Sequence, residues 1–119
     1  MEELLEALNH MEFHTMYVEE IFQGRKRNDF DNERIRAFIE VELLKDIRTY
    51  KEEHRKQSDK IRGEVYRLIY GMCRNSRLAE CIADDYCLIY DGQVVGYEDI
   101  WFLKFIQCYE ASVIPTGQL

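Results

Sequence analysis

The sequence predicts a mainly α fold: a small domain of three to five helices with a C-terminal β-hairpin. Apolar residues recur every three or four positions in residues 4–22 and again in residues 35–50 and 61–72, which is the periodicity of amphipathic helices. A different pattern follows in residues 86–90, a β-prone run that ends at Asp91-Gly92. That dipeptide is typical of a two-residue hairpin turn between two strands.

We expect residues 2–23 to form one amphipathic helix. Steps of four and three residues separate the members of a three-heptad apolar seam: Leu4, Leu8, Met11, Thr15, Val18 and Phe22. Further apolar residues widen this seam, and so wide an apolar face needs packing partners on more than one side. Gly24 supplies a C-terminal stop.

A second helix is predicted to begin near Asp29 or Asp31, either of which can cap it. Its length depends on residues 51–60, which contain no aliphatic residue but consist of good helix formers. Because the heptad phase continues through them, we favour one long helix over residues 31–72. The alternative is a break near Ser58-Asp59, which could cap a new helix.

The last third of the chain changes in character. Asn75-Ser76 can cap a short helix through residues 77–83, and the predicted hairpin occupies residues 86–96. Glu98 or Asp99 then opens a closing helix that is apolar nearly all round, so we expect it to be central to the core. We predict one domain over residues 1–119, in which residues 113–119 form a flexible tail.

Charge is segregated along this acidic chain, whose formal net charge is −7. Residues 1–23 carry six acidic residues and no Lys or Arg, whereas residues 45–77 carry ten basic residues against five acidic ones. This pattern indicates helices that pack by complementary charge or a basic surface that faces a partner. The candidates for a polar partner-binding surface are Arg48, Lys51, Arg55 and Lys56.

Nucleic-acid binding is the alternative function for the basic segment 45–77. Its Lys and Arg side chains could follow a phosphate backbone, with tyrosines available to stack on bases. Interleaved acidic residues and a pI of about 5.0 disfavour this function, because the whole chain repels a polyanion.

The sequence gives no support for an enzyme or a metal protein. Glu6, His10 and His14 are spaced four apart on the predicted first helix, as a metal site would need, but no fourth ligand suggests itself. The four cysteines lack zinc-ligand spacing and are expected to be reduced, buried thiols. Nucleophile motifs and Gly-rich phosphate loops are absent from the sequence. We therefore predict no catalytic residue, no metal and no cofactor.

The most plausible role is a non-enzymatic protein–protein interaction module, such as a small adaptor, inhibitor or immunity-type factor. We expect self-association as a homodimer through Leu8, Met11, Val18 and Phe22. No apolar run reaches the roughly 18–20 residues of a membrane helix, and the start Met-Glu-Glu is unlike a signal peptide. We expect a cytoplasmic location and no membrane partner; a viral or mobile-element origin would fit such a chain.

Overall fold

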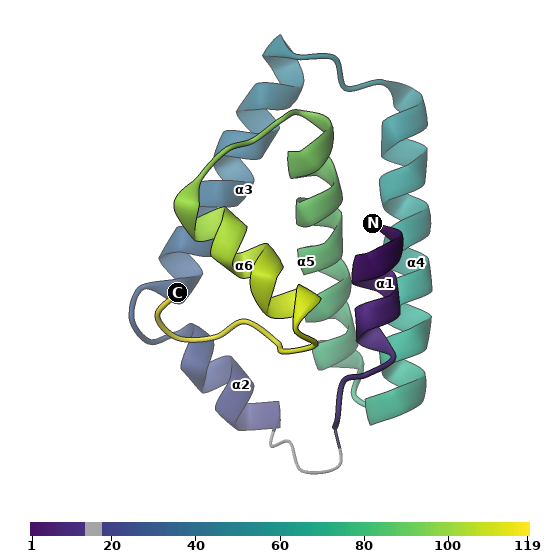
Figure 1. Ribbon diagram of the computed structural model, residues 1–119, viewed down its shortest axis with the longest axis vertical. Coiled ribbons are helices and arrows are strands. Elements are labelled where there is room, and N and C mark those ends of the chain that lie inside the picture. Colours follow the sequence, from purple (N-terminus) through teal and green to yellow (C-terminus); the bar gives the residue numbers. More distant parts are fainter. Residues whose placement is uncertain (14–17) are drawn as a thin grey trace. The chain divides into compact units, whose positions relative to one another are not determined.

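The computed structural model describes residues 1–13 and 18–119, which form six helices and no strand (Figure 1). The helices are α1 (Glu2–Leu8), α2 (Val18–Arg25), α3 (Phe30–Ile47), α4 (Glu52–Cys73), α5 (Ser76–Val94) and α6 (Ile100–Glu110). The predicted mainly α class is confirmed, whereas the predicted hairpin is wrong. The chain divides into two compact units, residues 1–37 with 98–119 and residues 38–97. Each unit is described by itself.

Residues 86–94 belong to helix α5, where the sequence predicted a strand and a turn. The apolar run from Tyr86 to Ile89 is buried throughout, because this part of α5 fills the core of the second unit. A short apolar run does not distinguish a strand from a buried helix by its periodicity. Asp91 and Gly92 are buried inside the helix. The predicted start is right, since the Asn75 side chain accepts a hydrogen bond from the Leu78 amide at 2.9 Å.

Helices α3 and α4 are separated at residues 48–51, so the continuous helix over 31–72 is wrong and the alternative break is misplaced. Lys51 is the N-cap of α4, and its backbone N–H donates to His54 Nδ1 at 3.0 Å. Ser58, the alternative cap, is buried within α4 and its carbonyl accepts a hydrogen bond from the Cys87 thiol. The chain turns where Tyr50 reaches Asp91, a contact that no local pattern reveals.

The described residues of segment 2–23 include two short helices in place of the single predicted one. Helix α1 ends at Leu8, residues 11–13 are not helical, and α2 begins at Val18. Thr15 of the predicted seam lies outside the described residues. Helix α1 packs against α6, where the Ser112 hydroxyl donates to the Ala7 carbonyl at 2.7 Å. This packing covers the last turn of α1, where Ala7 and Leu8 are buried.

The first unit has an aromatic core built around α6. Phe105 is fully buried, and its ring lies 5.2 Å from that of Trp101, 5.7 Å from that of Tyr109 and 6.3 Å from that of Phe30. Helix α6 is thus central to the core of this unit, as expected, although only one of its faces is buried, since Ile100 is 75% exposed.

The C-terminal segment returns to α2 in this unit. The Gly117 amide donates to the Gly24 carbonyl at 3.1 Å, and a side chain at Gly24 would lie 3.2 Å from Thr116 Cβ. Helix α2 continues through Gly24 to Arg25, so this glycine permits close approach of the tail within the last turn of the helix. Ile114 is buried. The flexibility of residues 113–119 stays a prediction.

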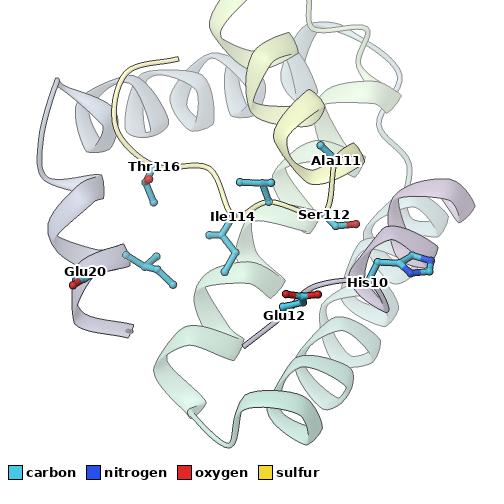
Figure 2. Close-up of a pocket in the computed structure, with 9 residues that line it drawn as sticks. His10, Glu12, Glu20, Ala111, Ser112, Ile114 and Thr116 are labelled. Carbon is cyan, nitrogen blue, oxygen red and sulfur yellow. The ribbon is translucent and has the colours of Figure 1, made fainter. Parts of the chain in front are cut away.

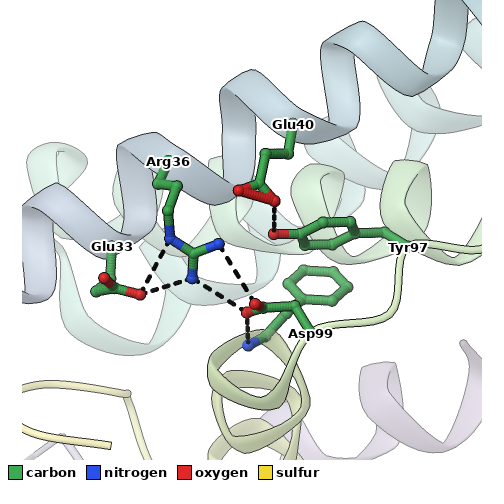
Figure 3. Close-up of polar contacts among 6 residues, drawn as sticks. Glu33, Arg36, Glu40, Tyr97 and Asp99 are labelled. Atoms are coloured by element: carbon green, nitrogen blue, oxygen red, sulfur yellow. Dashed lines mark hydrogen bonds and ion pairs between the residues drawn. The ribbon is translucent and has the colours of Figure 1, made fainter.

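Asp99 begins α6 as the sequence predicted and has a second role. Its carboxylate accepts the Phe102 amide at 2.9 Å, which is an N-cap hydrogen bond. The Arg36 guanidinium donates to both Asp99 oxygens, at 3.2 and 3.3 Å, and also to Glu33 (Figure 3). One carboxylate therefore caps α6 and joins it to the first turns of α3.

Asp99→Ala is expected to lower the free energy of unfolding by about 1–2 kcal/mol, because both the cap and the ion pair are lost. Asp99→Asn keeps an oxygen that can cap the helix, so its loss of unfolding free energy should be less than half that of Asp99→Ala. Urea unfolding followed by circular dichroism measures both. Glu98→Ala, which alters the neighbouring exposed carboxylate, is the control. Equal stability of the Asp99→Ala and Glu98→Ala variants would contradict the double role.

The second unit is built on α4 and α5, which lie side by side (Figure 1). Apolar side chains three or four residues apart on each helix meet between them, as expected of packed amphipathic helices. They are Ile61, Val65 and Ile69 from α4, and Leu78, Ile82, Tyr86 and Ile89 from α5. Arg74, in the left-handed conformation at φ 56°, ends α4 and starts the short connection to α5.

Candidate functional site

The part of α3 that lies in the second unit exposes a row of large apolar side chains. We call Phe38, Ile39, Leu43 and Ile47 the apolar row; they are 48%, 51%, 61% and 77% exposed. Ile39, Leu43 and Ile47 follow one another at steps of four, so they lie along one face of the helix. Contiguous exposed apolar surface of this kind is typical of sites that bind another protein.

The inward contacts of the same helix segment are largely polar. Lys45 Nζ lies 2.9 Å from Asp91 and 2.6 Å from Glu42. Tyr97 donates its hydroxyl to Glu40 at 2.6 Å (Figure 3). Val41 is the one fully buried apolar side chain in residues 38–47. Long polar side chains therefore join this segment to α5 and to the residues that follow α5.

Arg48 adds a further link to the end of α5. Its guanidinium donates to the Val95 carbonyl at 2.6 Å and to the Gly96 carbonyl at 3.1 Å. Gly96 has φ +67°, and a side chain there would lie 3.2 Å from the Arg48 guanidinium. A glycine at this position thus satisfies both the left-handed backbone and the close approach of Arg48.

An ordinary surface helix directs its apolar side chains to the core and its charged side chains to water. Residues 38–47 of α3 largely reverse this arrangement. Leaving a Leu, Ile or Phe side chain in water forgoes about 1.5–3 kcal/mol relative to full burial. The reversal marks the apolar row as the best candidate functional surface within the described residues.

Asp91 is the centre of the polar contacts beneath this helix. It is 8% exposed and accepts both the Tyr50 hydroxyl, at 2.6 Å, and Lys45 Nζ. Burial, together with the hydrogen bond and charge of Asp91, raises the pKa of Tyr50. Burial alone would lower the pKa of Lys45, but its hydrogen bonds to Glu42 and Asp91 raise it overall.

Alkaline pH is expected to destabilise the protein through these groups. Tyr50 and Lys45 have higher pKa values in the folded protein than in the unfolded chain, where they are about 10–10.5. Their contribution to stability is therefore complete below about pH 10 and is lost as the pH rises through their pKa values in the folded protein. Tyr50→Phe should be less stable than the parent at about pH 8, with a difference that shrinks above about pH 10. Urea unfolding across this range measures the difference. A difference that stays constant across the range would contradict the assignment.

The four predicted partner-binding residues lie in the second unit, in the segment that follows the apolar row. Arg48, Lys51, Arg55 and Lys56 are all exposed. Arg48 follows α3, Lys51 caps α4, and Arg55 lies 3.7 Å from Glu52. Whether these residues bind a partner stays a prediction.

The predicted self-association residues are divided by their burial. Leu8 and Met11 are buried, whereas Val18 and Phe22 are partly exposed. The apolar surface of the first two is already covered within the chain, and the homodimer stays a prediction.

The sequence predicted that the members of the apolar row belong to the second helix, but no pattern in it distinguished them as a surface. The available signal was that residues 38–47 are apolar around most of the helix. Such a helix has more apolar surface than a single packing face can cover.

The described part of each unit also has a surface hollow. One, of about 440 Å³, is lined by Ile21 and the C-terminal segment; Glu12 and Glu20 lie on opposite sides of Ile114 (Figure 2). The other, of about 490 Å³, lies between α4 and α5 where Arg62 pairs with Asp84.

Neither hollow brings metal ligands together. Among the described residues, no three or more His, Cys, Asp or Glu side chains are grouped to hold a metal ion. His14, which the sequence grouped with Glu6 and His10 as metal-site spacing, lies outside the described residues. All four cysteines are free and only Cys87 is buried, so the prediction of buried thiols holds for that one alone.

A family model described as immunity protein PIM1 matches residues 2–116. The chain belongs to this family. No curated protein and no solved structure matches the chain. Membership of the immunity protein PIM1 family confirms the broad prediction of an immunity-type factor that binds another protein, and it suggests a non-enzymatic role.

The family gives no support to nucleic-acid binding by residues 45–77, and the structure pairs several of their basic side chains with carboxylates: Lys45, Arg55, Lys60 and Arg62. None of the helices in the described part of the chain combines the length and apolar character needed to cross a membrane. The cytoplasmic location and the viral or mobile-element origin stay predictions.

Proposed function

We propose that this member of the immunity protein PIM1 family neutralises a protein toxin by binding it through the apolar row of α3. The family supplies the class of partner, since an immunity protein acts against a toxin. The observation that carries the choice of surface is the reversal of α3, whose large apolar side chains are exposed while its inward contacts are polar.

The apolar row has the character of an interface core. Interfaces gain most of their affinity from a few central, desolvated anchors, and the remaining contacts exclude water around them. Full burial of a large apolar side chain is worth about 1.5–3 kcal/mol. About half or more of each of the four side chains is still exposed, and burying that part can offset some of the cost of association. We place the toxin's complementary apolar surface over Leu43 and Ile47, the most exposed members of the row.

Arg48, Lys51, Arg55 and Lys56 form a polar border to this surface in the proposal. Charges at the rim of an interface chiefly change the association rate and its salt dependence. The double variant Arg55→Glu/Lys56→Glu should therefore associate about tenfold more slowly at low salt, with little change in the dissociation rate. Biolayer interferometry at two salt concentrations separates these rates. Unchanged association at low salt would remove the two residues from the border.

The function is tested by capture followed by growth protection. The purified chain is immobilised, and a protein retained from a lysate of the source organism is identified by mass spectrometry. That protein is then expressed alone and together with the chain in a neutral host. We expect the captured protein to stop growth when it is expressed alone, and the chain to restore growth.

The surface is tested in the same assay with two variants. Ile47→Asp, at the most exposed position of the row, should lose both capture and protection, whereas Lys60→Ala on α4 should retain both. A captured protein that does not affect growth, or an Ile47→Asp variant that protects fully while folded, would contradict the proposal.

A further inference from the structure

The helix that carries the apolar row has little apolar packing to hold it in place. Close backbone approach between helices in the second unit is extensive for α4 with α5 and is sparse for α3. Val41 is fully buried and Leu44 is partly buried, but the long-range hydrogen bonds from residues 38–48 are made by polar side chains. The position of this helix segment therefore depends on a small number of long side chains.

Two of these polar links share one acceptor, the Asp91 carboxylate. It accepts Lys45 from within α3 and Tyr50 from the connection that follows α3. The Lys45 ammonium also lies 4.5 Å from the centre of the Tyr50 ring, so the three side chains form one cluster. We call Asp91, Lys45 and Tyr50 the Asp91 clamp.

We infer that Asp91 is a positioning residue, which holds residues 38–47 of α3 through Lys45 and Tyr50 so that the apolar row is a fixed surface. The role in partner binding rests on the proposed function, but the clamp itself does not. Hydrogen bonds to a carboxylate with little exposure are stronger than those between neutral groups. Removing the charge of Asp91 should therefore let this segment open locally while the α4–α5 pair stays folded.

Hydrogen–deuterium exchange of residues 38–47 tests the clamp directly. Asp91→Asn keeps the size of the side chain and an acceptor for Tyr50 but loses the charge that pairs with Lys45. We expect exchange in this segment to be about tenfold faster than in the parent, which matches the worth of one charge-assisted hydrogen bond. Asp84→Asn is the matched control, because it makes the same change on the same helix at a carboxylate that pairs with Arg62.

Two further variants separate positioning from general stability. Ile69→Val removes one methylene from the α4–α5 core and lowers stability without touching the clamp. It should speed exchange in α4 and α5 at least as much as in residues 38–47, whereas Asp91→Asn should act on residues 38–47 selectively. If Asp91→Asn prevents folding, Tyr50→Phe removes only one of the two links, and about threefold faster exchange in the same segment is expected.

A double-variant cycle and a binding measurement complete the test. If Lys45 and Asp91 act together, Lys45→Met combined with Asp91→Asn should open residues 38–47 no more than the worse single variant. The captured toxin should dissociate about tenfold faster from Asp91→Asn and within about twofold of the parent rate from Ile69→Val. Equal exchange in Asp91→Asn and Asp84→Asn, or equal dissociation from Asp91→Asn and Ile69→Val, would overturn the inference. Failure of the parent chain to capture a toxin would instead overturn the proposed function.

Discussion

Phe105→Ala is expected to lower the free energy of unfolding of the first unit by about 3–5 kcal/mol. Phe105 is fully buried, and its ring contacts those of Phe30, Trp101 and Tyr109. The substitution removes transfer free energy and leaves a cavity that three large rings cannot close without losing their own contacts. Phe105 thereby joins Phe30 of α3 to Trp101 and Tyr109 of its own helix, α6.

Trp101, the only tryptophan of the chain, reports on this cluster by fluorescence during urea unfolding. Leu103→Ala, two residues earlier on the same helix, is the control because Leu103 is 54% exposed. That change should cost no more than about 0.5 kcal/mol. A similar loss of stability in the two variants would contradict the assignment of Phe105 as the centre of the core.

The parts of the fold that local chemistry determines could be predicted from the sequence. Asn75 and Asp99 were both expected to cap helices, and each accepts a backbone amide three residues later. A capping hydrogen bond involves only neighbouring residues, so the necessary information lies in a short stretch of sequence. The helical character of the segments followed from apolar periodicity for the same reason.

The errors arose where distant residues decide the local structure. Asp91-Gly92 has a strong hairpin preference, but burial within α5 and the contacts of Asp91 with Lys45 and Tyr50 outweigh it. The helix break at residues 48–51 includes Tyr50, which makes one of these contacts. Lys45 and Asp91 are 46 positions apart, and no periodicity relates residues at that separation.

The candidate surface could not be predicted from the sequence for a related reason. Apolar residues at positions 38–47 occur around most of the helix, and a helix with two apolar faces does not reveal which one is buried. Only the structure shows Val41 inside and Leu43 outside. These two residues are close in sequence and similar in character, and they provide the sharpest test of the surface.

Leu43→Asp is expected to weaken toxin binding at least about 100-fold, because a carboxylate would be desolvated at the centre of the apolar row. Its stability should stay within about 0.5 kcal/mol of the parent, since Leu43 is 61% exposed. Val41→Asp is the matched comparison, because it introduces the same acid on the same helix two residues earlier, at a fully buried position. It should unfold the second unit, because an unpaired buried charge costs several kcal/mol.

Circular dichroism and urea unfolding measure the stability of both variants, and interferometry with the captured toxin measures affinity. Opposite outcomes at positions 41 and 43 are expected only if the exposed face of α3 binds the toxin and its buried face stabilises the fold. A folded Leu43→Asp variant that binds as the parent does would move the toxin site away from α3. A Leu43→Asp variant that unfolds would mean instead that the apolar row is covered within the chain, which its exposure contradicts.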